Sequence, residues 1–171
     1  MTASRLSRVL PMVLAVGVTI GLDQAIKWLV EAYLPFHQLI PVAPLLALYR
    51  TWNTGIAFSM LAGLHDVGLL LMTTGVVTLV IFLWWRTPPE RRMSHLGYAL
   101  IIGGALGNMI DRAVYGHVVD YILFHTTNWS FAVFNLADAC ISVGAGLIAL
   151  DEVLVWRRQR VEDRREQDER R

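Results

Sequence analysis

The sequence predicts an all-α membrane protein with four transmembrane helices, a small outer β-sheet and an interfacial segment beside it. Two observations carry this prediction. Of the 171 residues, 55% are hydrophobic and only 17% are charged, with a mean hydropathy of +0.47, whereas an ordinary soluble domain carries about 25% charged residues. The apolar residues also gather into four long runs, which leave too little polar surface for a soluble bundle of buried helices.

Composition excludes several other classes of protein. The apolar content excludes an intrinsically disordered chain. A single cysteine, Cys140, excludes a disulfide-stapled module, a zinc ribbon and an iron–sulfur site. The net charge of +1 says little, because the last fifteen residues alone hold seven arginines and five acidic residues. We therefore expect a single four-span membrane domain over residues 1–156 and a charged cytoplasmic tail over 157–171.

The predicted spans cover residues 9–30, 67–85, 96–113 and 135–156. The second carries no formal charge, and at about 1.5 Å per residue its length crosses a hydrocarbon core of about 30 Å. The other three contain polar groups near one end. A cleaved signal peptide is the alternative for the first run, but the run continues at helical spacing past Leu22 without a small-x-small cleavage site. It is therefore predicted as a retained span.

The arginines predict the orientation, because short loops rich in Lys and Arg stay on the cytoplasmic side. They flank the start of the first span, the connection between the second and third, and the end of the fourth: Arg5, Arg8, Arg86, Arg91, Arg92, Arg157, Arg158 and Arg160. The two outer connections, 31–66 and 114–134, contain one arginine, Arg50, and no lysine. Both termini are therefore predicted to be cytoplasmic.

The outer connections have a composition of their own. Leu46–Asn53 and His117–Phe124 are rich in aromatic and aliphatic residues and too short to span a membrane, so they are predicted as short strands or interfacial segments. Prolines interrupt residues 35–44 and prevent one continuous helix there.

Ionisable groups in or beside spans are costly in lipid and are therefore candidates for function. Four aspartates are predicted near the outer face: Asp23, Asp111, Asp120 and Asp138. Asp23 has Lys27 one helical turn away, and Asp111 is followed by Arg112. Asp120 and Asp138 have no cation nearby in sequence. If these two meet, they would share a proton and act as acid and base on a water molecule. On the residues alone, a packing or transport network stays open.

Other chemistries have weaker support. A metal site would use His117, Asp120 and His125, but the chain has no H-E-x-x-H motif, and on a strand His117 and Asp120 project to opposite faces. A serine hydrolase would need a G-x-S-x-G elbow, and Cys140 lies in an apolar helix that disfavours a thiolate. A proton-coupled transporter would show repeated halves, and a purely structural subunit would not need asparagines beside its aspartates.

Five segments resemble the conserved blocks of the lipoprotein signal peptidase family, also called signal peptidase II. In chain order they are Asp23-Gln-Ala-Ile-Lys27, Asn53-Thr-Gly-Ile-Ala-Phe-Ser59, Gly103-Gly-Ala-Leu-Gly-Asn-Met-Ile-Asp-Arg112, His117-Val-Val-Asp120 and Phe134-Asn-Leu-Ala-Asp138. With the four spans, the resemblance covers roughly residues 9–156. The departures are conservative and spare the two aspartates: Ile56, Met109, Ile110 and Cys140.

The resemblance implies an intramembrane aspartic endopeptidase of the bacterial cytoplasmic (inner) membrane. It would remove the signal peptide from diacylglyceryl-modified prolipoproteins, before the lipidated cysteine, and be inhibited by globomycin. Its catalytic pair would be Asp120 and Asp138. The matching positions also imply substrate-binding or pair-supporting residues and a structural polar pair: Asn53, Asn108, Arg112 and Asn135, then Asp23 and Lys27. No metal or organic cofactor is implied, and we expect a monomer in membrane lipid with no nucleic-acid partner.

Overall fold

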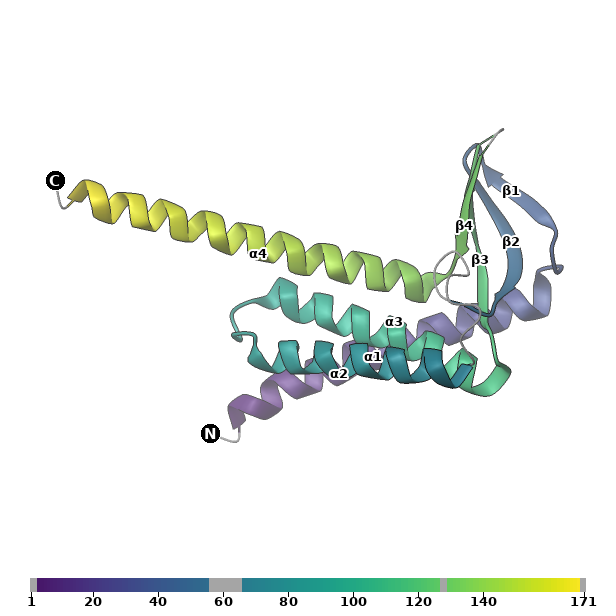
Figure 1. The fold of residues 1–171 in the computed structure, drawn as a ribbon, viewed down its shortest axis with the longest axis horizontal. Coiled ribbons are helices and arrows are strands. Elements are labelled where there is room, and N and C mark those ends of the chain that lie inside the picture. The colour runs from purple at the N-terminus through teal and green to yellow at the C-terminus, as the bar shows by residue number, and fades with distance from the viewer. Residues whose placement is uncertain (1–2, 56–65, 127–128, 170–171) are drawn as a thin grey trace.

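The computed structural model describes residues 3–55, 66–126 and 129–169, and over these residues it confirms the predicted fold class (Figure 1). Four long apolar helices form a bundle, and a small antiparallel sheet lies at one end of it. The helices are α1 (Ala3–Tyr33), α2 (Asp66–Arg86), α3 (Arg92–Tyr115) and α4 (Leu136–Glu169). The strands are β1 (Leu39–Ala43), β2 (Leu46–Asn53), β3 (Val118–His125) and β4 (Ser130–Phe134).

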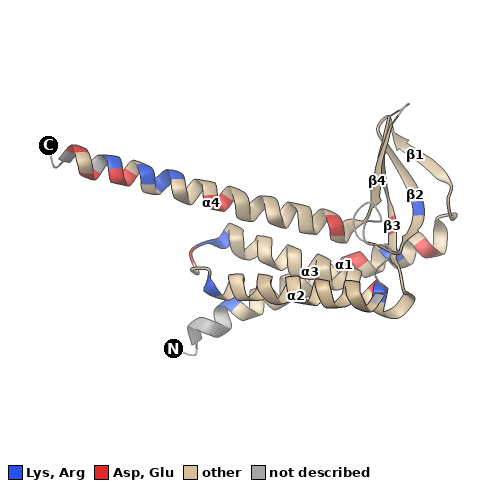
Figure 2. Ribbon diagram, viewed as in Figure 1, with Lys and Arg blue, Asp and Glu red and all other residues tan. Residues whose placement is uncertain are grey.

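The central helix of the bundle is α3, which packs against α1, α2 and α4. It is also the most buried helix, whereas the other three direct large apolar side chains outward. Leu22 of α1 is 55% exposed and Leu71 of α2 is 68% exposed. Charged residues lie mainly toward the ends of the bundle and along the tail (Figure 2). An apolar surface of this extent is stable against lipid rather than water, and the chain is a multi-span membrane protein.

Glycines allow α3 to approach its neighbours closely. A Cβ atom added at Gly104 would lie 2.5 Å from the backbone carbonyl oxygen of Ala137 in α4, and one at Gly107 would lie 2.6 Å from a carboxylate oxygen of Asp23 in α1. Both distances are too short for a carbon atom. The close contacts of α3 with α1 and α4 near the sheet therefore depend on these two glycines.

We expect Gly104→Ala to lower the stability of the protein by about 1–3 kcal/mol, because the clash is with backbone and forces α3 and α4 apart. Thermal unfolding in detergent measures the effect. Gly146→Ala is the matched control, since nothing lies within 4 Å of a Cβ atom at Gly146. Equal melting temperatures for the two variants would contradict this account of the α3–α4 contact.

The sheet has the strand order β1-β2-β3-β4, and every neighbouring pair is antiparallel. The predicted strand Leu46–Asn53 coincides with β2, and the predicted His117–Phe124 is shifted by one residue in β3. The edge strands β1 and β4 were not predicted. Pro41 lies within β1, where an edge position tolerates the missing N–H group.

The sheet is fixed to the end of α1 by apolar contacts. Val119 and Tyr121 of β3 form a buried cluster with Val30 of α1. Because successive side chains of a strand point to opposite faces, Asp120 between them points away from this cluster. In Figure 1 the N-terminal end of α1 and the C-terminal end of α4 lie at the end of the bundle away from the sheet.

Candidate active site

The site is built around the first turn of α4. The first amide N–H groups of a helix lack partners within the helix, and here the first three each donate to a side chain. Their acceptors are the Tyr121 hydroxyl at 3.2 Å, Asp23 Oδ1 at 3.0 Å and Asn135 Oδ1 at 3.0 Å. The three acceptors come from β3, α1 and the residue preceding α4. The start of α4 is therefore held from several directions.

Asn135 and Asp138 form a reciprocal capping arrangement at this helix start. The Asn135 side chain accepts the Asp138 N–H, and Asp138 Oδ2 accepts the Asn135 N–H at 3.2 Å. This is the geometry of a capping box, in which the third helical residue bonds back to the N-cap residue. Asp138 is thus fixed in place at the start of α4.

Asp120 is nearly fully buried on β3 and receives two hydrogen bonds. Asn53 Nδ2 donates to its Oδ2 at 2.9 Å, and Asn135 Nδ2 donates to its Oδ1 at 2.7 Å. Burial raises the pKa of Asp120 to about 7, and the negative charge of Asp138 acts in the same direction. The hydrogen bonds from the two asparagines oppose this rise in pKa. Asp120 is therefore suited to hold a proton near neutral pH.

Asn108 of α3 links the two carboxyl groups. Its Nδ2 donates to Asp138 Oδ1 at 2.9 Å, and its Oδ1 accepts from Asn135 Nδ2 at 3.2 Å. The Oδ1 atom also accepts a hydrogen bond from Lys27 Nζ at 2.8 Å. Since an ammonium group can only donate, the contact with Lys27 fixes which end of the Asn108 amide faces Asp138.

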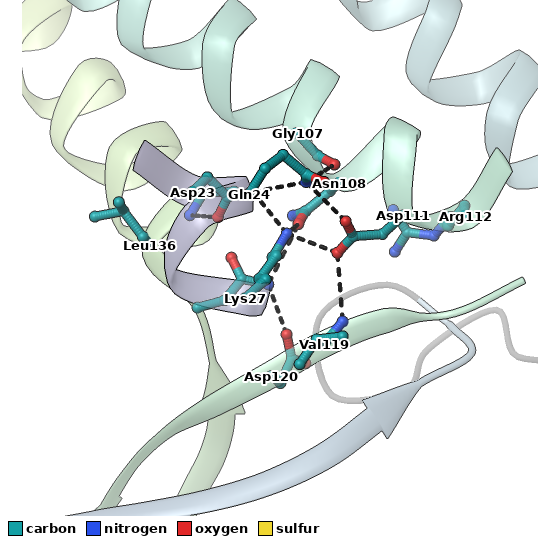
Figure 3. A network of polar contacts seen from close by, with 12 residues as sticks. Asp23, Gln24, Lys27, Gly107, Asn108, Asp111, Arg112, Val119, Asp120 and Leu136 are labelled. Atoms are coloured by element: carbon teal, nitrogen blue, oxygen red, sulfur yellow. Dashed lines mark hydrogen bonds and ion pairs between the residues drawn. The ribbon is translucent and has the colours of Figure 1, made fainter. Parts of the chain in front are cut away.

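Lys27 is the centre of a buried polar cluster (Figure 3). It is 3% exposed, and its Nζ lies 2.8 Å from Asp23 Oδ2 and 2.8 Å from Asp111 Oδ2. With the bond to Asn108, all three ammonium donors have acceptors. The Asp23–Lys27 pair has the helical spacing that the sequence suggests, whereas Asp111, beside Arg112 in sequence, reaches across to the lysine of α1.

Two supporting residues were missed in the sequence. Gln24 Nε2 donates to Asp111 Oδ1 at 2.8 Å and to the Gly107 carbonyl at 3.2 Å, so it joins α1 to α3. Tyr121 supports the start of α4, and burial raises its pKa to about 12. A polar side chain beside Asp23 in an apolar span was a usable signal for Gln24. Nothing in the sequence pattern distinguishes Tyr121 from an ordinary strand aromatic.

Asn53 and Arg112 both hold the chain just after β2. Asn53 Oδ1 accepts the Gly55 N–H at 2.9 Å, and a guanidinium N–H of Arg112 donates to the Gly55 carbonyl at 2.6 Å. Ile56 and the rest of that sequence block, up to Ser59, lie outside the described residues. Asn53 therefore contacts the carboxyl group of Asp120, while Arg112 binds the backbone just after β2.

Both candidate carboxyl groups line a cavity of about 730 Å³. This volume is in the range of small-molecule and peptide-binding pockets. Asn53, Asn108 and Arg112 also line it, and its remaining walls are largely apolar: they include Met72, Val76, Ile101, Ala105, Phe131, Phe134, Ile141 and Val143. The cavity thus combines two carboxyl groups with a surface suited to an apolar ligand.

The residues of the alternative metal site are placed differently. The His117 ring lies against Trp52 with the ring centroids 4.5 Å apart, in a run of aromatic contacts outside the cavity lining. Among the side chains that the structure describes, no three His, Cys, Asp or Glu residues converge as a metal site would require. Asp120 and Asp138, by contrast, both line the large cavity.

A family model for signal peptidase II matches residues 15–154. The chain belongs to the signal peptidase II family. It is 58% identical to a lipoprotein signal peptidase of Sinorhizobium fredii over 154 residues, which covers 90% of this chain and 93% of that protein. It is 59% identical to a lipoprotein signal peptidase of Brucella ovis over 140 residues, covering 82% and 88%. Membership of signal peptidase II makes the chain a peptide-bond hydrolase.

Solved structures show the same fold. A bacterial membrane enzyme matches with a TM-score of 0.75 at 24% identity, covering 84% of this chain and 87% of that one. A second bacterial membrane enzyme matches with a TM-score of 0.72 at 25% identity, covering 82% and 90%. The four-helix bundle with its end-on sheet is therefore an established architecture for membrane enzymes.

Proposed function

We propose that Asp120 and Asp138 are the catalytic pair with which this signal peptidase removes signal peptides from diacylglyceryl-modified prolipoproteins. The observation that carries the proposal is their joint placement. Both carboxyl groups line one large cavity, and Asn135 and Asn108 tie them into one hydrogen-bonded unit. Two carboxyl groups that share a proton are the machinery with which aspartic peptidases activate water.

The roles follow from the two environments. Asp138, at the positive end of α4, is the base that takes a proton from water as the water oxygen attacks the carbonyl carbon before the lipidated cysteine. Asp120 begins protonated and gives its proton to the departing amine when the C–N bond breaks. The immediate products are the carboxylic acid of the signal peptide and the free amine of the lipidated cysteine, and the acid then gives its proton to the amine or to water. The proton taken by Asp138 restores the pair after transfer between the two carboxyl groups.

The supporting residues have distinct tasks. Asn53 and Asn135 hold Asp120, and Asn108 holds Asp138. Asn53 and Asn108 also line the cavity, where we expect them to contact a peptide backbone, and Arg112 keeps the chain after β2 in position. Asp23 and Lys27 lie behind this layer and act through Asn108 and the start of α4.

The membrane arrangement completes the proposal. We place the protein as a monomer in the bacterial inner membrane, with the sheet and the catalytic pair at the outer face. The arginine distribution supports this orientation. The N-terminal end of α1 and the C-terminal end of α4 also lie together at the end of the bundle away from the sheet. The apolar walls of the cavity would then take the acyl chains at the level of the outer leaflet, with the scissile bond near the two aspartates.

The test is the cleavage of a lipobox precursor with and without its diacylglyceryl group. Burial of each CH₂ group contributes about 0.8 kcal/mol, so a few buried methylene groups correspond to a preference of at least about ten-fold for the modified precursor. Purified protein in detergent and a gel-shift assay measure the two rates. Globomycin should block the reaction. Equal cleavage of both precursors would show that the enzyme does not recognise the diacylglyceryl group.

A further inference from the structure

A second cavity lies at the end of the bundle away from the sheet. Its described lining residues are Arg8 and Val9 of α1, Trp84 and Trp85 of α2, and His95 of α3, and its volume is about 110 Å³. We call it the Arg8 cavity. Arg8 begins the first membrane span, Trp85 nearly ends the second, and His95 lies in the first turn of the third. The cavity is therefore at the level where the bundle meets the lipid headgroups.

The polar groups of the Arg8 cavity are nearly all hydrogen-bond donors. Arg8 is half-buried and, in the described part of the chain, has no carboxylate partner, unlike Arg91, which contacts Asp151 at 2.8 Å. The Trp84 side chain is 9% exposed. Its ring lines the cavity, and no described residue accepts a hydrogen bond from its indole N–H group, which leaves this donor for a ligand. None of the described lining residues is acidic.

The His95 ring lines the cavity with one donor that is already used. His95 Nε2 lies 3.0 Å from the Pro88 carbonyl oxygen and must donate to it, since a carbonyl only accepts. The guanidinium group of Arg8 and the indole ring of Trp84 thus line one small space that has no described carboxylate in its lining.

We propose that the Arg8 cavity binds the phosphate group of an anionic phospholipid, in the leaflet opposite the catalytic pair. The guanidinium fork matches phosphate geometry, and the volume suits one phosphate group rather than a peptide. The flanking tryptophans suit a headgroup site, because tryptophan rings concentrate at the membrane interface. The two tails of the lipid would lie along the outward-facing apolar side chains of α1 and α2, such as Leu10 and Leu83. This lipid would hold α1 against α2, which pack mainly through α3.

The experiment uses the full chain in mild detergent, freed of lipid and titrated with phosphatidylglycerol, with phosphatidylcholine of the same acyl chains, and with inorganic phosphate. Native mass spectrometry counts bound lipid, and thermal unfolding reports stabilisation. We expect one tightly bound phosphatidylglycerol, weakened at least about ten-fold by Arg8→Gln. Trp84→Phe keeps the ring and removes only the N–H donor, so it should weaken binding without loss of the fold.

Arg158→Gln is the matched control, because it removes one exposed arginine from the same end of the molecule. It should leave lipid binding unchanged. An equal loss in Arg158→Gln and Arg8→Gln would reduce the effect to general surface charge and overturn the proposal. Equal binding of both phospholipids would do the same. Binding of inorganic phosphate without phosphatidylglycerol would show that the cavity takes a free anion and not a lipid.

Discussion

Asp120→Asn and Asp138→Asn should each reduce the turnover number by about 10³-fold or more, because general acid–base catalysis of this kind contributes about 10²–10⁴-fold for each group. An amide has nearly the shape of a carboxyl group but does not act as an acid or a base at neutral pH. The measurement is cleavage of the lipid-modified precursor by each purified variant, with the melting temperature as the check on folding.

Both substitutions also change the hydrogen bonds of the site. Both oxygens of Asp120 and both oxygens of Asp138 accept hydrogen bonds, whereas an asparagine offers only one acceptor. In each variant the new amide N–H group therefore faces an N–H donor that the carboxylate accepted, which costs about 1–3 kcal/mol of stability. Asp151→Asn is the matched control, since Asp151 accepts from Arg91 and Ser94 at the far end of the bundle. It should lose stability and keep activity. A fully active Asp138→Asn would refute the catalytic pair.

The same pair predicts the pH dependence of the wild-type enzyme. Asp120 has a pKa of about 7, so its proton is present below this pH and is lost as the pH rises through it. Loss of that proton removes the general acid. We therefore expect kcat/KM to decline above about pH 7, by about ten-fold per pH unit once Asp120 is mostly ionised. An activity that stays constant up to pH 9 would mean that Asp120 does not supply the proton.

The fold was predictable where one strong physical constraint acts on a long segment. A run of apolar residues long enough for the membrane must form a helix, since lipid cannot satisfy free backbone groups. This reasoning located four helices, and α4 continues as one helix into the charged tail as far as Glu169. The edge strands β1 and β4 escaped prediction because short edge strands are specified by their pairing partners rather than by their own sequence.

The site was predictable in its residues and less so in its connections. A carboxylate in or beside a span without a local cation needs an explanation, which singled out Asp120 and Asp138, and the family resemblance added the asparagines around them. The sequence could not reveal that Asp23 accepts a backbone N–H of α4, because that contact joins residues more than a hundred positions apart. The N-cap pattern of Asn135 and Asp138 was readable, and it is the feature that distinguishes the two aspartates.

Lys27→Met should lower the turnover number by about 10²-fold, because it releases the Asn108 amide that orients Asp138, and small displacements of a reacting group have effects of this size. The change also leaves the carboxylates of Asp23 and Asp111 buried without their cation, which costs about 3–5 kcal/mol of stability. Loss of activity alone would therefore not separate a positioning role from a structural one.

Two measurements separate these roles. The positive charge of Lys27 lowers the pKa of Asp120, so any residual activity of Lys27→Met should decline at a higher pH than in the wild-type enzyme. A triple variant that adds Asp23→Asn and Asp111→Asn makes the cluster neutral, and neutral replacements of buried ionic groups often restore stability. It should melt near the wild-type temperature and still turn over slowly, since nothing in it fixes the Asn108 amide. Wild-type activity in the triple variant would show that Lys27 only balances charge in the bundle.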